Sequence, residues 1–205
     1  MKHILAAVAL ASVSIGASAQ LAYSGGTNIT FSGYDPSGTT GVQTQGLREA
    51  MISSTIAGNL TATFLGKEAL DTDTYTFAMA SGTLLNTSAI GSMISGPVGV
   101  GNLNFTFADT FAGTSVGNGG VAGAYTSYVI LGSYVTGGAF TPYTDGGLYQ
   151  MVLGFNDGLK VDADYDDMVV GLNVSAVPEP ETYALMLAGI GAIGFIARRR
   201  KQSST

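Results

Sequence analysis

An acidic segment near the C-terminal end holds the residues best suited to chemistry. Six of the twelve residues from Asn156 to Asp167 are Asn or Asp. Asp162, Asp164 and Asp166 recur at every second position, so an extended chain would place their three carboxylates on one side. Calcium binds about six to eight hard oxygen ligands, which Asp, Asn and backbone carbonyls supply. The segment is therefore a candidate calcium site.

The spacing resembles the start of an EF-hand loop, but the rest of that motif is missing. Asp167 stands where the turn glycine belongs, and Asn173 where the bidentate glutamate belongs. The segment is thus not an EF-hand. A solvated acidic turn is the alternative interpretation, because Asp and Asn are common in turns. Lys160 alone does not balance the neighbouring carboxylates, so a cation site would need further compensation.

Several catalytic residue types are missing from the chain. There is no cysteine, and the one histidine is His3, close to the N-terminus. These absences exclude disulfides, thiol chemistry and, beyond the N-terminal segment, Ser-His-Asp catalysis and His-ligated zinc. Residues 20–177 carry 12 acidic and three basic side chains, a formal charge of −9. So acidic a domain is not expected to bind nucleic acid, which requires a basic surface.

The elements that would position the acidic segment are expected to be β-strands. Thirty glycines and alternating large and small polar residues favour short strands joined by turns. Further strands are expected at 125–136, 148–155 and 168–174, and one helix at 47–56. The whole predicts an all-β single domain at 20–176, a β-sandwich or jelly-roll-like fold. The alternating large residues are Leu60, Ala62 and Phe64, then Tyr75, Phe77 and Met79, then Leu103, Phe105 and Phe107.

The N-terminus has the pattern of a secretory signal peptide over residues 1–19. A short basic start precedes an uncharged, mostly apolar run, and the small residues Ala17 and Ala19 precede Gln20. That order is typical of a cleaved export signal. We therefore expect export across the inner membrane, with cleavage before Gln20.

The C-terminus, residues 177–205, has three parts. Pro178, Glu179 and Pro180 precede fifteen uncharged residues, Tyr183 to Ala197, and a cluster of four cations closes the run. Fifteen residues give about 22 Å of helix, against a hydrocarbon core of about 30 Å. Bilayer thinning and snorkelling basic side chains would cover the difference. We expect a single transmembrane helix with its basic end in the cytoplasm. The cations are Arg198, Arg199, Arg200 and Lys201.

This tripartite tail resembles the PEP-CTERM sorting signal of exported proteins in Gram-negative bacteria that make exopolysaccharide. The resemblance implies recognition of Pro178, Glu179 and Pro180 by an exosortase, a membrane-embedded cysteine transpeptidase that cuts near the motif. It also implies transient membrane anchoring, followed by a location at the cell surface or outside the cell. The two prolines favour an extended chain that is accessible to a processing enzyme.

A second, looser resemblance concerns the acidic segment itself. The run from Leu153 to Val170 is similar to the closing motif of many PEP-CTERM proteins and of related surface β domains thought to bind calcium. Residues 66–69 are similar to another segment found in that group. The resemblance implies a set of candidate calcium ligands: Asp157, Asp162, Asp164, Asp166 and Asp167.

Two classes of function are compatible with these observations. The first is a non-enzymatic surface or matrix protein, associated with exopolysaccharide or biofilm. The second is a protein that acts on glycans, either a carbohydrate-binding module or an extracellular enzyme. Such an enzyme would use a pair of carboxylates from Glu49, Glu68 and the acidic segment. The missing tryptophan weakens the binding module, because aromatic platforms for sugars usually include it.

Overall fold

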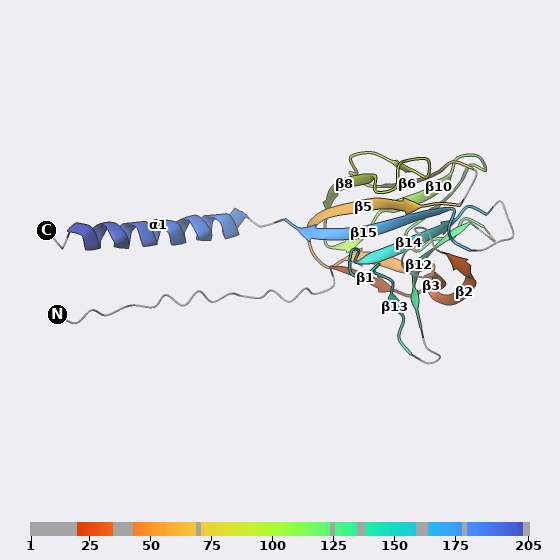
Figure 1. Ribbon diagram of the computed structural model, residues 1–205, viewed down its shortest axis with the longest axis horizontal. Helices are drawn as coiled ribbons and strands as arrows, with labels where there is room; N and C mark the ends of the chain where they lie inside the picture. Colours follow the sequence, from red (N-terminus) through yellow and green to blue (C-terminus); the bar gives the residue numbers. More distant parts are fainter. Residues whose placement is uncertain are drawn as a thin grey trace.

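The computed structural model describes seven stretches of the chain: residues 20–34, 43–68, 71–123, 126–134, 138–158, 164–177 and 180–202. The expected signal peptide, with Ala17 and Ala19, lies outside them. The described residues form antiparallel sheets and one C-terminal helix (Figure 1). The expectation of an all-β domain is therefore confirmed.

The largest sheet has eight strands, all paired antiparallel. The strands at 125–136, 148–155 and 168–174 that the sequence predicts all lie in it, with slightly different bounds. Its order is β2 (Thr27–Tyr34), β3 (Gln43–Arg48), β12 (Ser127–Ser133), β14 (Met151–Asn156), β15 (Met168–Ala176), β5 (Gly58–Gly66) and β8 (Met93–Val98), with β13 (Thr141–Pro142) beside β12.

Two smaller sheets complete the domain. The four-stranded sheet has the order β11 (Thr114–Gly117), β10 (Phe105–Asp109), β6 (Asp73–Phe77) and β7 (Leu84–Leu85). The three-stranded sheet has the order β1 (Leu21–Ser24), β4 (Met51–Ser54) and β9 (Gly101–Asn102).

The core lies between the large sheet and the four-stranded sheet, and aromatic rings join them. Phe107 of β10 stacks on Phe155 of β14, with ring centroids 5.0 Å apart. Phe105 meets Tyr128 of β12 edge-on at 5.2 Å. Each fully buried side chain of this size contributes about 1.5–3 kcal/mol to folding. Two sheets that pack face to face in this way form the layered arrangement expected of a sandwich.

The outer face of the large sheet is also covered, which explains why every residue of β14 is buried. Tyr165 lies over Gly154, where an added Cβ would come within 2.3 Å of the Tyr165 carbonyl oxygen. Tyr149 lies over Gly171 in the same way. The two glycines let covering segments approach the sheet backbone closely. Tyr165 thereby fixes the chain between Asp164 and Asp167 against the end of the sheet.

Two local expectations are wrong. The segment 47–56 is not a helix, because β3 ends at Arg48, Glu49 adopts a left-handed φ of 64°, and β4 follows. The chain reverses at Glu49, so the segment forms the ends of two strands. Met79 does not extend the buried stripe of Tyr75 and Phe77, since it lies in a turn with φ 62° and is 76% exposed.

The C-terminal helix α1 runs from Pro180 to Gln202. Proline suits the first helical position, where its missing N–H would be unpaired in any case. In Figure 1, α1 follows the end of β15 and extends away from the sheets. The expected transmembrane helix is not confirmed: no helix among the described residues is long and apolar enough to cross a membrane. The run from Tyr183 to Ala197 is only fifteen residues long, with Glu181 shortly before it and Arg198 directly after it.

Candidate functional site

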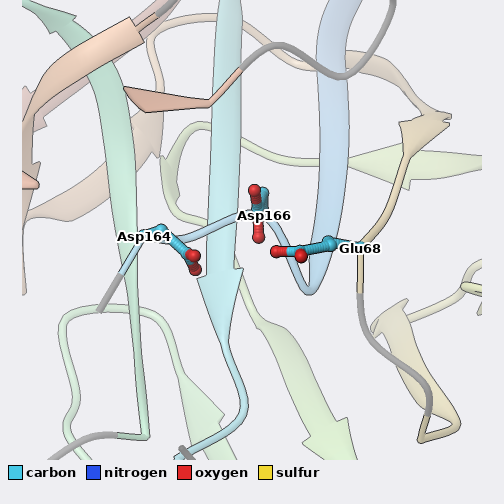
Figure 2. A group of neighbouring side chains, drawn as sticks. All are labelled: Glu68, Asp164 and Asp166. Carbon is cyan, nitrogen blue, oxygen red and sulfur yellow. The ribbon is translucent and has the colours of Figure 1, made fainter. Parts of the chain in front are cut away.

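Three carboxylates from two distant segments meet at one end of the large sheet. Glu68, Asp164 and Asp166 each offer an oxygen, and these oxygens all lie within 4.8 Å of one another. Figure 2 shows the three side chains converging beside the strands. Glu68 is exposed, whereas Asp164 and Asp166 are partly buried. We refer to these three residues as the triad site.

The sheet explains why these segments meet. Glu68 follows the end of β5, and Asp166 precedes the start of β15, the neighbouring antiparallel strand. The Glu68 amide donates a hydrogen bond of 2.8 Å to the Asp166 carbonyl, which continues the pairing of the two strands. Between the two aspartates, the buried Tyr165 packs on Phe31 at 5.2 Å, and its hydroxyl lies 3.2 Å from Ser127 Oγ. The ring therefore anchors the loop that carries two of the carboxylates.

Electrostatic repulsion in the triad site is strong. Burial is the largest of several causes that together raise the pKa of Asp166 to about 8. The others are the Asp164 carboxylate, a hydrogen bond with it, Glu68 and Asp167. Asp166 Oδ1 is buried and accepts no hydrogen bond from the described residues. A bound cation would relieve the repulsion and supply the missing partner, because calcium binds carboxylate oxygens without histidine or thiolate.

The acidic segment does not act as one ligand set in the described residues. Asp164 and Asp166 join the triad site as the sequence predicts, whereas Asp162 lies outside the described residues. Asp167 instead accepts a hydrogen bond of 2.8 Å from the Asp157 amide through its Oδ2. Asp157 and Asp167 both raise the pKa of Asp73, a buried residue of β6. Asp164 and Asp166 therefore belong to the triad site, whereas Asp157 and Asp167 lie near Asp73.

Sequence reasoning did not place Glu68 among the candidate calcium ligands. Ninety-five residues separate it from Asp164, and no spacing rule connects them. The register of β5 against β15, with Gly66 opposite Val169, is what brings Glu68 beside Asp166. A correct pairing of these two strands would have revealed it.

The structure describes only some residues of the expected tail and cleavage sites. Gln20 lies at the start of the described chain, where its carbonyl accepts a hydrogen bond of 2.9 Å from the Thr55 amide. Pro178 and Glu179 lie outside the described residues, and Pro180 begins α1. Arg198 is exposed on α1, which also includes Arg199 and Arg200. The described side chains from Ala184 to Gly194 are all exposed.

Comparison with known proteins identifies the tail. Residues 176–201 match the PEP-CTERM protein-sorting motif. The chain is thus a protein with a PEP-CTERM sorting motif, as the sequence predicts, and the motif implies export and sorting by an exosortase to the cell envelope or surface. No curated protein and no solved structure matches the chain significantly. The match covers the tail and leaves the β domain without an assigned role.

Proposed function

We propose that this chain is a non-enzymatic structural protein of the cell surface or extracellular matrix, which an exosortase processes at its C-terminal tail. The observation that carries the proposal is the sorting motif at residues 176–201. The tail acts as an address that the exosortase reads, and the β domain is the part that remains and performs the role outside the cell.

The exposed side chains of α1 support attachment of the unprocessed chain to the membrane. Leu185, Met186 and Leu187 are consecutive, so they point to three different sides of the helix, and all are exposed. Ile190 and Ile193 extend this apolar surface. A helix that is apolar all round is stable only in apolar surroundings. In our proposal, lipid supplies these surroundings until the exosortase acts, and the basic cluster beginning at Arg198 stays at the headgroups.

The β domain is suited to a role that depends on cations. Residues 20–177 carry a formal charge of −9, and the triad site concentrates three carboxylates within 4.8 Å. We propose that calcium binds Glu68, Asp164 and Asp166 and stabilises this end of the domain. The acidic surface would associate with exopolysaccharide through bridging cations.

Two features support a structural role over action on glycans. The segment beyond residue 19 contains no histidine and no cysteine, which removes most general bases and nucleophiles. Tyr75, Tyr128 and Tyr165 are buried in the core or under the loop of the triad site, so they are not free to stack on sugars.

Replacing the sorting residues in the host tests the proposal. The full chain with Pro178, Glu179 and Pro180 all changed to alanine should stay with the membrane fraction at its unprocessed mass. The wild type should appear at the surface with a shortened C-terminus. Gln202→Ala, which lies outside the matched residues, is the control and should behave as the wild type. Processing that is unchanged in the triple variant would contradict the proposal.

A further inference from the structure

A second group of carboxylates is buried at the edge of the core, away from the triad site. Asp73 of β6 and Asp109 of β10 are directly paired across the two strands. Asp73 is 0% exposed and Asp109 is 1% exposed. They occupy the inward positions that continue the aromatic stripe of Tyr75 and Phe107, because side chains two residues apart share a face. Like charges directly opposite each other on a sheet are destabilising unless something compensates them.

Each of these carboxylates has an oxygen without a hydrogen-bond donor among the described residues. Those atoms are Asp73 Oδ1 and Asp109 Oδ2. The other Asp109 oxygen is satisfied, since Oδ1 accepts from the amides of Phe111 and Ala112 at 2.7 and 3.1 Å. Buried polar atoms are nearly always paired, and leaving one unpaired is costly. The two free oxygens therefore call for a partner that these protein groups do not supply.

A buried amide adds a third oxygen of the same kind. Asn86 is 2% exposed, and its Nδ2 donates to Asp73 Oδ2 and to the Asp71 carbonyl, both at 2.9 Å. These bonds fix the amide next to Asp73 and leave Oδ1 buried without a donor among the described residues. The Asn86 amide carries no charge. Its unpartnered oxygen is therefore an observation separate from the clustering of carboxylates. It points to a ligand that accepts electron pairs from oxygen.

The described surroundings of Asp73 add further negative charge. Besides burial, the carboxylates of Asp157, Asp167, Asp109 and Asp71 all raise the pKa of Asp73, to about 8. The ion pair of Arg48 with Glu49 lies elsewhere, on β3 and the turn after it. Protonation of Asp73 would remove one charge and supply one donor. It would still leave the Asn86 oxygen, or the Asp109 oxygen, without a partner.

We propose that Asp73, Asn86 and Asp109 form a buried calcium site, with Asp157 and Asp167 as the carboxylates beside it. In our proposal, one divalent cation is the partner of the three unpartnered oxygens and offsets the facing charges of β6 and β10. Calcium accepts mixed carboxylate and amide oxygens in irregular arrangements, whereas magnesium demands a nearly regular octahedron and retains water. The site would join the four-stranded sheet to the segment that precedes β15, because Asp167 belongs to the latter. It shares no proposed ligand with the triad site and does not involve the sorting tail.

The test counts calcium ions bound by the full-length chain in which Asp164→Asn and Asp166→Asn remove the triad site. Isothermal titration with calcium chloride should show one remaining ion per chain. Adding Asp73→Asn should weaken that binding at least about tenfold, since ligand charge sets calcium affinity. The control is Asp145→Asn on the same background, which also removes one carboxylate charge. Asp145 accepts a hydrogen bond from Tyr143, and its substitution should leave calcium binding unchanged.

Melting temperatures keep the test decisive if the added variant folds poorly. Saturating calcium should raise the melting temperature of the background protein by about 5–10 °C. In chelator, Asp73→Asn should melt no lower than the background, because it removes a repelled charge. No calcium binding by the background protein, or binding that Asp73→Asn leaves intact, would overturn the inference. Neither result would affect the sorting proposal, which the location and mass of the tail variants test.

Discussion

Asp73 and Asp109 face each other across β6 and β10, at the point where the buried aromatic stripe of the core ends. Their pairing places two carboxylates where the pattern of the strands would place another pair of aromatic rings. The triad site lies beside the start of β15, whereas α1 follows the other end of that strand (Figure 1). Nine residues of strand, about 30 Å, separate them. Processing of the tail therefore takes place far from the carboxylates.

The stability of the domain in chelator should fall as the pH rises. The pKa values of Asp73 and Asp166 are raised from 3.8 to about 8. Each carboxyl therefore stabilises the fold while protonated, and that contribution is lost as the pH rises from about 4 through about 8. Melting temperatures of the full chain in chelator should drop between about pH 5 and about pH 8. A melting temperature that rises over this interval would contradict the assignment.

Asp166→Asn should have opposite effects with and without calcium. In chelator the variant should melt at or above the wild type, because it removes a charge that Asp164 and Glu68 repel. With calcium it should gain less than the wild type, because the triad site loses a charged ligand. Asp145→Asn provides a matched control that should show neither effect. An equal calcium shift in all three proteins would rule out the triad site.

Gly154→Ala should destabilise the domain and disturb the triad site together. An added Cβ would lie 2.3 Å from the Tyr165 carbonyl oxygen, so the segment that carries Asp164 and Asp166 must move. Forced overpacking of this kind typically costs about 1–3 kcal/mol. Urea unfolding would measure the cost. Gly99→Ala, where an added Cβ meets no atom within 4 Å, should change stability little, and an equal loss in both variants would contradict the packing described.

The contact between the sheets predicts a large difference between two phenylalanines close in sequence. Phe107→Ala should cost about 3–5 kcal/mol, because Phe107 is fully buried and stacks on Phe155. Phe111→Ala should stay within about 0.5 kcal/mol of the wild type, because Phe111 is 77% exposed. Chemical denaturation of the two variants measures the difference. Similar losses at both positions would mean that the sheets do not share this core.

The sequence predicts the long strands well and the local reversals poorly. Alternation over Leu60–Phe64 and Tyr75–Phe77 marks a buried face correctly, because the period of two follows directly from strand geometry. The same reasoning gives no warning that Glu49 and Met79 adopt left-handed backbone conformations. Those conformations depend on where the chain must turn to meet its neighbours, which local composition does not specify.

The residues of the candidate sites also differ in how far the sequence predicts them. Asp164 and Asp166 can be predicted because they belong to one short acidic run. Glu68, Asp73 and Asp109 lie outside that run, and strand pairing brings them to Asp166 or to each other. Candidate ligands that are brought together by the register of a sheet therefore cannot be predicted from their spacing in sequence.

The most direct test of the central claim is the intact mass of the protein recovered from host cells with and without an active exosortase. With the enzyme, the surface form should begin at Gln20 and lack the α1 segment. Without it, the protein should retain the whole tail and remain with the membrane. Retention of the tail in both kinds of cell, with the same location, would contradict the account.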